Sequence, residues 1–341
     1  MEMTPKERVI CALNLDEPDR VPYCEANIDP VVAAPLLKHE PPKEFLGITY
    51  HRLVDEEVAL SKFLRRDNIS YRLRAPVFNE GPKGKDGRTF YGRGLIRSEK
   101  DLELLDFPDP YDDSLYIEAE EYAKKKGDFA LCLSTRMGIQ STYMSMGLEE
   151  FFYALHDNPM LVEKVMNAYF EWTAVAVERI CQLDFDFIWS SDDVAWKIGP
   201  LFSPKFFRDV VVPKMQKVAE KITIPWVHHS DGNILPLLDD FIDLGVKGIH
   251  PIEPTAMDIN ELKKNYGNKI CLLGNIDLNT LSMGTPEQVD EEVKKRIREI
   301  GPGGGYIVSS GNSIAAYCKP ENVIAMAEAI QKYGKYPISI V

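Results

Sequence analysis

The chain has 341 residues with 40 basic and 53 acidic side chains, which gives a formal net charge of −13. This acidic balance argues against nucleic acid as the main partner, because binding phosphates requires a surface dense in Lys and Arg. The composition is 45% hydrophobic and 27% charged, which is typical of a globular protein and excludes disordered and fibrous classes. The length fits one large α/β barrel or two ordinary domains.

The six cysteines are widely spaced and never form a C-x-x-C pair, so the sequence predicts neither a compact zinc knuckle nor a disulfide framework. Charges occupy the first residues, where a secretory signal needs an apolar core, and no apolar stretch is long enough to cross a bilayer. We therefore expect reduced thiols, a cytoplasmic location and no contact with a membrane.

The first elements are indicated by capping and turn residues. Thr4 and Pro5 form an N-cap and a first-turn proline, which predict a helix over 4–14. A strand is expected over 20–24. The pattern between about 35 and 126 is irregular and predicts an elaboration near the N-terminus, with a hairpin at Asp86-Gly87.

From residue 128 onward, short apolar runs alternate with longer helical patterns. Because each run is continuously apolar, the strands should form a parallel sheet covered on both faces, either closed or doubly wound. No G-x-G-x-x-G or Walker loop follows a strand, so a nucleotide-binding fold loses its main support. The length and the early strand favour a single (β/α)8 barrel domain over 1–341. The expected strands lie over 129–134, 185–190, 222–228, 246–250, 270–273 and 306–309, and the expected helices over 148–156, 160–181, 204–221, 233–243, 258–265, 285–300 and from 320.

Polar residues follow most of these strands, at the end of the barrel where functional groups lie. Any one of them alone could serve only to cap a helix or bind a loop amide. Together they predict a site at the carboxyl ends of the strands. They are Glu25, Arg136, Asp192, Asp193, His229, Asp231, Glu253, Asn275, Asp277, Ser310 and Asn312.

The segment His228-His229-Ser230-Asp231 carries the densest group of candidates. His-x-Asp spacing can direct an imidazole and a carboxylate toward one metal ion or one substrate oxygen. Strand alternation turns one of the two adjacent histidines into the packing, and we predict that His229 is the residue in the pocket.

Other candidates are weighed in the same way. Of Asp192 and Asp193, one is expected to cap a loop and the other to face the pocket. Glu253 is flanked by prolines, which is an unusual setting for a merely solvated acid. Tyr143 and Trp196 are candidates for a flat apolar wall, although most aromatic residues in such a barrel belong to the core.

Segments along the whole chain resemble the uroporphyrinogen decarboxylase superfamily. They include TPKERVICALNLDEPDRVP near the start, HHSDGNILPLL and LLGNIDLNTLSMGTPEQV in the middle, and PENVIAMAEAIQKYGKYP near the end. This resemblance implies a (β/α)8 TIM barrel with its pocket at the C-terminal face of the strands.

Two branches of that superfamily fit the residues poorly. The tetrapyrrole decarboxylases carry an early arginine-containing motif, whereas this chain has the acid and amide of Glu25-Ala26-Asn27 there. This replacement disfavours binding of a polycarboxylated porphyrinogen. The methyltransferases that act on thiols hold zinc with His-x-Cys and a later Cys, but this chain has Asp231 and Asn312 in those positions. Carboxylate and amide ligands suit a harder, more Lewis-acidic centre, or no metal.

The remaining branch resembles the methyltransferase component of corrinoid O-demethylases. Its members transfer a methyl group from an aryl methyl ether such as guaiacol, veratrol or vanillate to a Co(I) corrinoid on a partner protein. Co(I) supplies the nucleophile, so the enzyme must stabilise the departing phenolate with an acid or a Lewis-acidic metal. A methylcobamide-to-thiol methyltransferase and a decarboxylase of a tetrapyrrole or another acid remain as alternatives.

This resemblance implies a role for each candidate. The expected cofactors are the corrinoid of the partner protein and a divalent metal such as zinc, and a homodimer is one assembly state we allow. His229, Glu253 and Asp193 are expected to be catalytic, and His229 and Asp231 to hold the metal. The expected substrate-binding residues are Glu25, Arg136, Tyr143, Trp196, Asn275 and Asn312.

Overall fold

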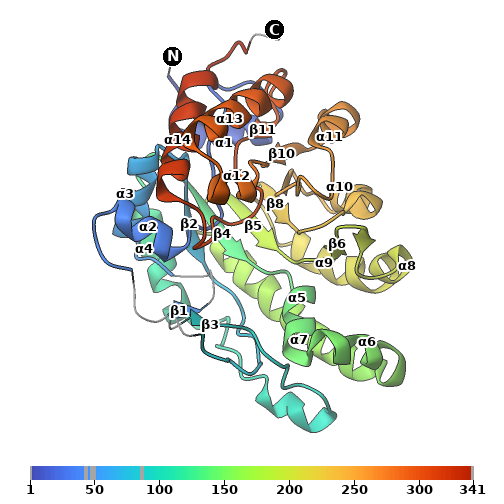
Figure 1. Ribbon diagram of the computed structural model, residues 1–341. Coiled ribbons are helices and arrows are strands. Elements are labelled where there is room, and N and C mark those ends of the chain that lie inside the picture. The colour runs from blue at the N-terminus through green and yellow to red at the C-terminus, as the bar shows by residue number, and fades with distance from the viewer. Residues whose placement is uncertain (1, 42–44, 47–50, 85–87, 339–341) are drawn as a thin grey trace.

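A curved sheet of seven parallel strands forms the centre of the computed structural model, which describes residues 2–41, 45–46, 51–84 and 88–338 (Figure 1). The strands follow one another around the sheet in the order β11-β10-β9-β8-β5-β4-β2. All six pairings are parallel. The strands are β2 (Asn68–Arg72), β4 (Ala130–Thr135), β5 (Phe187–Ser191), β8 (Trp226–His229), β9 (Gly248–His250), β10 (Cys271–Leu273) and β11 (Tyr306–Ile307).

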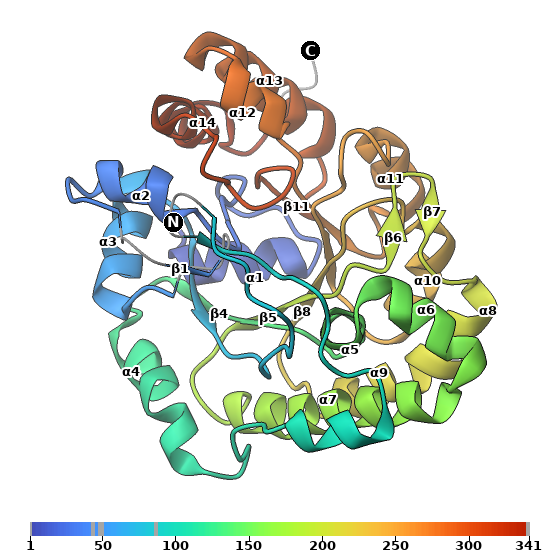
Figure 2. The same cartoon turned by 60° about the horizontal axis from the view of Figure 1, so that its bottom comes forward.

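The segment near Tyr23 closes the sheet into a ring between its two edge strands. Tyr23 forms a parallel bridge with Val308, beside β11, and its carbonyl accepts a hydrogen bond from Asp67 N, beside β2, at 2.7 Å. The strand expected over 20–24 is thus an extended segment with isolated bridges rather than a regular strand. Its position nevertheless completes the barrel that the sequence predicted, and Figure 2 shows the helices arranged around the strands.

Helices follow most strands and cover the outside of the barrel (Figures 1 and 2). Those predicted from residue 148 onward are present with shifts of a few residues at their ends, and the predicted first helix is α1, which Thr4 caps. The helices are α1 (Pro5–Leu13), α2 (Pro30–Leu36), α3 (Val54–Leu64), α4 (Ile117–Lys125), α5 (Ile139–Met146), α6 (Leu148–Asp157), α7 (Pro159–Ile180), α8 (Pro204–Phe206), α9 (Val212–Ala219), α10 (Leu238–Asp243), α11 (Ile259–Tyr266), α12 (Leu278–Met283), α13 (Pro286–Ile300) and α14 (Pro320–Tyr333).

The region from about 35 to 126 is more regular than its sequence suggested. It holds α3 and β2, a strand of the main sheet, as well as α4. Short strands β1 (Phe45–Leu46) and β3 (Arg88–Thr89) pair in parallel beside the barrel. Backbone hydrogen bonds join Glu80 to Arg93 as the arms of a hairpin. The tip expected at Asp86-Gly87 lies outside the described residues.

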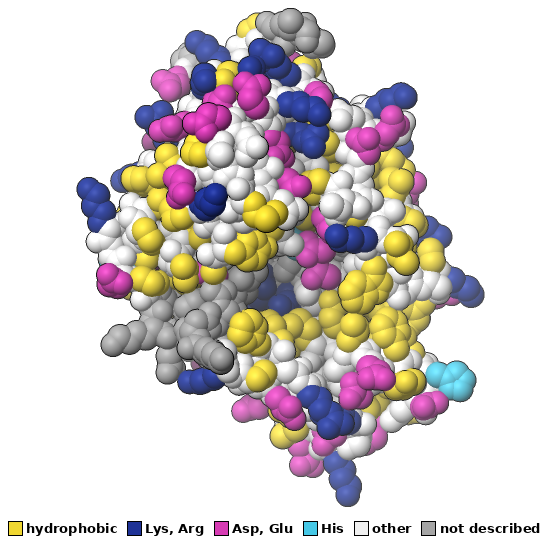
Figure 3. Space-filling model, in the orientation of Figure 1, with side chains coloured by type: hydrophobic (Ala, Val, Ile, Leu, Met, Phe, Trp, Pro, Cys, Tyr) yellow, Lys and Arg dark blue, Asp and Glu magenta, His cyan; other side chains and the backbone are white. Residues whose placement is uncertain are grey.

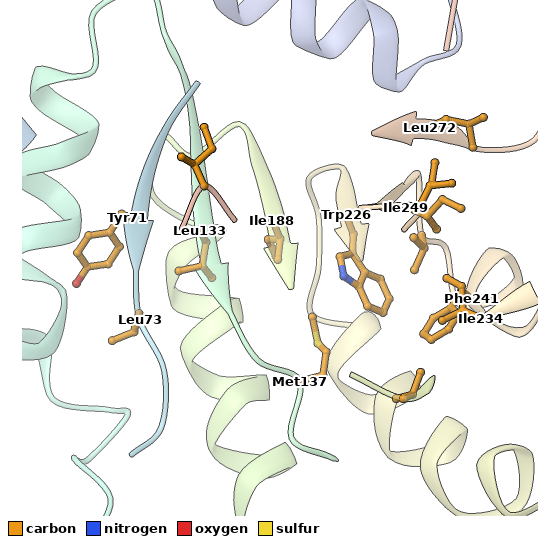
Figure 4. Close-up of a cluster of buried hydrophobic side chains, with 14 of the residues drawn as sticks. Tyr71, Leu73, Leu133, Met137, Ile188, Trp226, Ile234, Phe241, Ile249 and Leu272 are labelled. Atoms are coloured by element: carbon orange, nitrogen blue, oxygen red, sulfur yellow. The ribbon is translucent and has the colours of Figure 1, made fainter. Parts of the chain in front are cut away.

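Apolar side chains pack in two layers, one on each face of the strands. The outer layer packs the strands against the helices, and Figure 4 shows part of it, with Leu133, Ile188 and Trp226 on neighbouring strands. The inner layer fills the barrel, where Val9 and Leu13 of α1 pack against inward-facing side chains of the strands. Helix α1 therefore plugs the amino-terminal end of the barrel.

None of the helices in the described part of the chain is long and apolar enough to cross a membrane.

Candidate functional site

A cavity of about 420 Å³ opens at the carboxyl ends of the strands. Figure 3 shows a hollow near the middle of this face, with basic side chains deep inside it and acidic side chains beside it. Thus the cavity has walls of opposite charge with apolar surface between them. Its lining is Ala26, Asn27, Arg72, Arg74, Phe90, Tyr91, Ser134, Arg136, Gln140, Met144, Trp189, Ser191, Asp193, His229, Asp231, Asn312 and Ser313.

Asp193, His229 and Asp231 form one side of this cavity. His229 Nε2 lies 3.7 Å from Asp193 Oδ1 and 3.6 Å from Asp231 Oδ1. One ligand atom from each residue lies within 4.8 Å of the others. Burial raises the pKa of the Asp231 carboxyl, and the negative charge of Asp193 raises it further. The two acids therefore favour a cation or a proton between them.

Hydrogen bonds fix both carboxylates in place. Asp193 accepts hydrogen bonds from Gln140 Nε2 at 2.8 Å and from the backbone N–H of Asp231 at 3.0 Å. Asn312 Nδ2 lies 2.8 Å from each oxygen of Asp231. The acids are consequently oriented toward His229 by residues of α5, of the loop after β8 and of the loop after β11.

The loop after β8 turns sharply at Gly232. This residue has φ 80°, and a Cβ atom added there would lie 2.6 Å from the carbonyl oxygen of Trp196. Trp196 belongs to a small hairpin of β6 (Ala195–Trp196) and β7 (Gly199–Pro200), and its carbonyl accepts a hydrogen bond from Asn233 N at 2.8 Å. Glycine is thus required for the loop that carries Asp231 to pack against the hairpin.

A line of hydrogen bonds runs from His229 into the interior. His229 Nδ1 lies 2.7 Å from His250 Nδ1, His250 Nε2 lies 3.0 Å from Ser309 Oγ, and Ser309 Oγ lies 3.4 Å from Glu25 Oε2. Burial lowers the pKa of His250 well below its ordinary value, so its ring is neutral. In one proton arrangement of this line, each group donates toward Glu25. In that arrangement, His229 Nε2 presents its lone pair to the two aspartates.

Two pairs of adjacent residues divide as the sequence predicted. Asp192 accepts backbone hydrogen bonds from Met137, Gly138 and Gln140 near the start of α5, whereas Asp193 faces the cavity. His228 stacks on a core phenylalanine, with 4.3 Å between ring centroids, and burial lowers its pKa to about 3. His228 is therefore a neutral packing residue, and His229 is the residue in the pocket.

Of the ten residues to which the family resemblance assigned a role, five do not line the cavity. Glu253 accepts a hydrogen bond from Gly232 N at 3.2 Å and lies 3.6 Å from Lys197 Nζ, so it supports the loop after β8. The Tyr143 hydroxyl donates to the carbonyl of Asp193 at 3.1 Å. In this geometry both residues position the acids rather than contact a substrate.

The other three are Asn275, Trp196 and Glu25, which are buried behind the cavity or exposed outside it. Asn275 is buried and donates to the carbonyl of Ile252 at 2.8 Å, while the Trp196 side chain is 57% exposed on its hairpin. Glu25 is fully buried and accepts hydrogen bonds from the backbone N–H and the hydroxyl of Ser310. The structure thus brings together Arg136, Asp193, His229, Asp231 and Asn312, but not these three.

Burial raises the pKa of Glu25 to about 7, although hydrogen bonds from Ser310 oppose the shift. The folded state therefore holds this proton more tightly than the unfolded state, and the free energy of unfolding should fall as the pH rises from 4.5 to 7. We expect the free energy of unfolding of Glu25→Gln to change with pH by up to about 3 kcal/mol less than that of the native protein. Urea unfolding at pH 5 and pH 8 measures it. The exposed Glu328→Gln is the control, and an equal dependence in all three proteins would contradict the prediction.

An arginine wall, formed by Arg72, Arg74 and Arg136, lines the side of the cavity formed by β2 and β4. Of these three, only Arg136 was predicted from the sequence. Arg72 ends β2 and Arg74 lies two residues beyond it, and this strand was not predicted, yet the segment Asn68-Ile-Ser-Tyr-Arg-Leu-Arg74 alternates between polar and apolar residues. This alternation is the signal that could have found them.

The arginine wall shows that a carboxylate could bind in this cavity. The segment Glu25-Ala26-Asn27 predicted poor binding of a polycarboxylated porphyrinogen, but the Glu25 carboxyl group faces Ser310 inside the barrel. Cationic side chains reach the cavity from other strands instead. The acid at position 25 therefore does not by itself disfavour a carboxylated ligand.

The donor set of Asp193, His229 and Asp231 fits a divalent metal ion. One imidazole and two carboxylates are a ligand combination that suits zinc and harder divalent ions. The hydrogen bond to His250 fixes the orientation of the His229 ring, as is usual for metal-binding histidines. These three residues are those that would hold the ion.

Comparison with known proteins agrees with this architecture. The family model described as uroporphyrinogen decarboxylase (URO-D) matches residues 86–333. The uroporphyrinogen decarboxylase of Pseudoalteromonas atlantica is 28% identical over 146 residues, which cover 40% of this chain. The match spans only 39% of the length of that relative.

Two solved structures have the same fold over nearly the whole chain. A methyltransferase from Methanosarcina mazei has a TM-score of 0.75 and 21% identity, and the alignment covers 97% of this chain and 99% of the other. A B12-independent methionine synthase from Shewanella sp. has a TM-score of 0.55 and 13% identity over 92% and 98% of the two chains. Since the family model matches most of the sequence and the barrel is shared, the chain belongs to the uroporphyrinogen decarboxylase family.

Proposed function

We propose that this protein transfers a methyl group from an aryl methyl ether to the Co(I) corrinoid of a partner protein. The observation that carries the proposal is the combination of an acid–imidazole cluster with an apolar cavity. Such a cluster suits stabilisation of a departing oxygen, and Phe90, Tyr91, Met144 and Trp189 supply surface for an aromatic ring.

The absence of a thiol and an amine from the described lining of the cavity supports this reaction class. No cysteine or lysine is among the described residues that line it. Cys24, Cys132 and Cys271 are buried within the barrel, and burial raises the pKa of each thiol. A nucleophile supplied by the second substrate, such as a Co(I) corrinoid, fits this lining.

The proposed reaction is a displacement at the methyl carbon. Co(I) donates an electron pair to that carbon, the carbon–oxygen bond breaks, and its electron pair stays on the phenolate oxygen. A proton from Asp231, whose carboxyl pKa is raised by burial, passes to this oxygen, so the products are a phenol and methyl-Co(III). A divalent metal held by Asp193, His229 and Asp231 would act as a Lewis acid on the departing oxygen.

The family membership and one solved structure support the proposal. That structural neighbour is a methyltransferase, and the cavity opens at the carboxyl ends of the strands, where the active sites of such barrels lie. A corrinoid partner, the identity of the methyl donor and a homodimeric assembly all remain predictions.

The test mixes the purified protein with a reduced corrinoid protein and guaiacol, veratrol or vanillate. We expect the Co(I) spectrum to convert to methyl-Co(III), with one equivalent of phenol released per methyl group. No conversion with any methoxyarene would contradict the proposal. Omitting the ether is the control for oxidation of Co(I).

A second function, decarboxylation of an acid, is favoured by one observation, which is the arginine wall. Three guanidinium groups beside an acid–imidazole cluster would also hold a carboxylated substrate while it is protonated at carbon. Release of CO2 without any corrinoid distinguishes this function. Methyl transfer without CO2 release would exclude it.

A further inference from the structure

The arginine wall brings three positive charges together without an ion pair. Among the ion pairs of the described residues, none involves Arg72, Arg74 or Arg136. Glu57 and Asp192 act on these charges only from outside ion-pair distance. The Nε atom of each arginine is buried and has no hydrogen-bond partner in the described structure, and Arg74 donates to the neutral Ser134 Oγ at 2.9 Å. Partly buried guanidinium groups without an ion pair favour a ligand that brings negative charge.

The pKa shifts of the groups in and beside the arginine wall agree with a concentration of positive charge there. Burial lowers the pKa of Arg72 to about 10, and burial together with the charge of Arg136 lowers that of Arg74 further below its ordinary value. Burial would raise the pKa of the Tyr91 hydroxyl, but the charges of the wall, chiefly that of Arg136, outweigh burial and lower it. The wall therefore stabilises anions at its surface.

Strand register places the arginine wall relative to Asp193, His229 and Asp231. Arg72 pairs with Ser134, Ser134 with Trp189, and Ser191 with His229. Because Arg136 and Ser191 each follow a paired residue by two positions, Arg136, Ser191 and His229 belong to one layer of the barrel interior. Only β5 separates β4 from β8, so the backbones of Arg136 and His229 are about 10 Å apart. A substituted benzene ring spans such a gap once the side chains have reached inward.

The surface between the two ends suits an aromatic ring. Trp189 lies in the intervening strand, and Tyr91 lies over the Arg136 guanidinium with 5.6 Å between the ring centroid and Cζ. Phe90 and Met144 complete the apolar lining. The cavity therefore offers a cationic end, a flat apolar middle and an acid–imidazole end.

We infer that the substrate is an aryl ether with a carboxylate meta to its methoxy group, as in vanillate, bound with the carboxylate against Arg72, Arg74 and Arg136. The ether oxygen then lies at Asp193, His229 and Asp231. This inference rests on the proposed function for the identity of the reacting group, but the anion-binding end is argued from the cavity alone. The same anion chemistry could instead bind a phosphate group of a partner's corrinoid, and the test separates the two sources.

Calorimetric titration without any corrinoid protein tests the anion-binding end directly. Vanillate and its uncharged amide, vanillamide, have nearly the same shape. We expect vanillate to bind the enzyme at least about 10-fold more tightly, because charged hydrogen bonds to guanidinium groups are lost with the amide. Equal affinities, or no binding of either compound, would overturn the inference. Selective competition by inorganic phosphate alone would assign the wall to a phosphate instead.

Variants test whether the arginine wall causes the preference for vanillate over vanillamide. Arg136→Gln and Arg72→Gln should reduce the vanillate-to-vanillamide ratio to within about 3-fold, whereas Arg136→Lys, which keeps the charge, should retain part of it. Arg298→Gln on the exposed face of α13 is the matched control and should leave the ratio unchanged. Equal weakening of both compounds by Arg136→Gln would mean that the wall acts only structurally, and would overturn the inference. Melting temperatures confirm that each variant is folded.

Turnover with the corrinoid protein separates this inference from the proposed function. Selective binding of vanillate without any methyl transfer would leave the anion site in place and contradict the proposed function. Methyl transfer that is equally efficient from vanillate and vanillamide would support the proposed function and overturn the inference.

Discussion

Replacing His229 by alanine is expected to lower the rate of methyl transfer by about 10³-fold. Its Nε2 is the only imidazole nitrogen among the described residues that line the cavity, and both aspartates lie within 4 Å of it. The side chain is partly buried, and its hydrogen-bond partner His250 remains held by Ser309, so the fold should survive. The rate of methyl-Co(III) formation measures the effect, and circular dichroism checks the fold.

The same variant should also lose bound metal. Metal analysis of protein purified without chelators is expected to give about one zinc or other divalent ion per chain for the native protein and much less for His229→Ala. His156→Ala, on an exposed helix end, is the matched control and should change neither rate nor metal content. Unchanged methyl transfer by His229→Ala would remove this residue from the mechanism.

The second large effect concerns stability, where we expect Asp67→Ala to lower the free energy of unfolding by about 3–5 kcal/mol. Asp67 is fully buried beside β2, and its carboxylate accepts hydrogen bonds from Arg8, Arg20 and the backbone N–H of Tyr23. Its removal leaves the partly buried Arg20 without its carboxylate partner and leaves the buried Arg8 paired with Asp19 alone. It also releases the segment that closes the barrel.

Urea unfolding followed by tryptophan fluorescence measures this change. Glu328→Ala, which removes an exposed carboxylate from α14, is the control and should shift the free energy by less than about 0.5 kcal/mol. A similar stability for Asp67→Ala and Glu328→Ala would show that the ring closure at Tyr23 does not depend on this carboxylate.

The sequence predicted the barrel well where its strands are continuously apolar. From β4 onward every predicted strand is present, because a parallel strand buried on both faces leaves a plain apolar run. Strand β2 was missed because its inward face carries Ser70 and Arg72 rather than apolar residues. The polar face that hid the strand is the one that forms part of the cavity.

Residues at the site were predictable where strand alternation continues to the end of the strand. It separates His229 from His228 correctly, since β8 includes both. It fails for Glu253, because Ile252 has φ 55° and the left-handed backbone there redirects the chain after β9. Glu253 consequently supports Gly232 instead of lining the cavity. Contacts such as that between His229 and His250 join different strands and cannot be read from spacing.

Helix α1 limits the routes by which the two substrates can reach the cavity. Because Val9 and Leu13 pack into the inner layer beneath Trp189, the cavity has its opening at the carboxyl ends of the strands and none through the barrel floor. The methyl donor must therefore enter through the same opening that the methyl acceptor must approach. Because the described lining holds no cysteine or lysine to carry the methyl group between two half-reactions, we expect direct transfer with donor and acceptor present together. Initial-rate plots for the two substrates should then intersect, as in a ternary-complex mechanism, rather than run parallel.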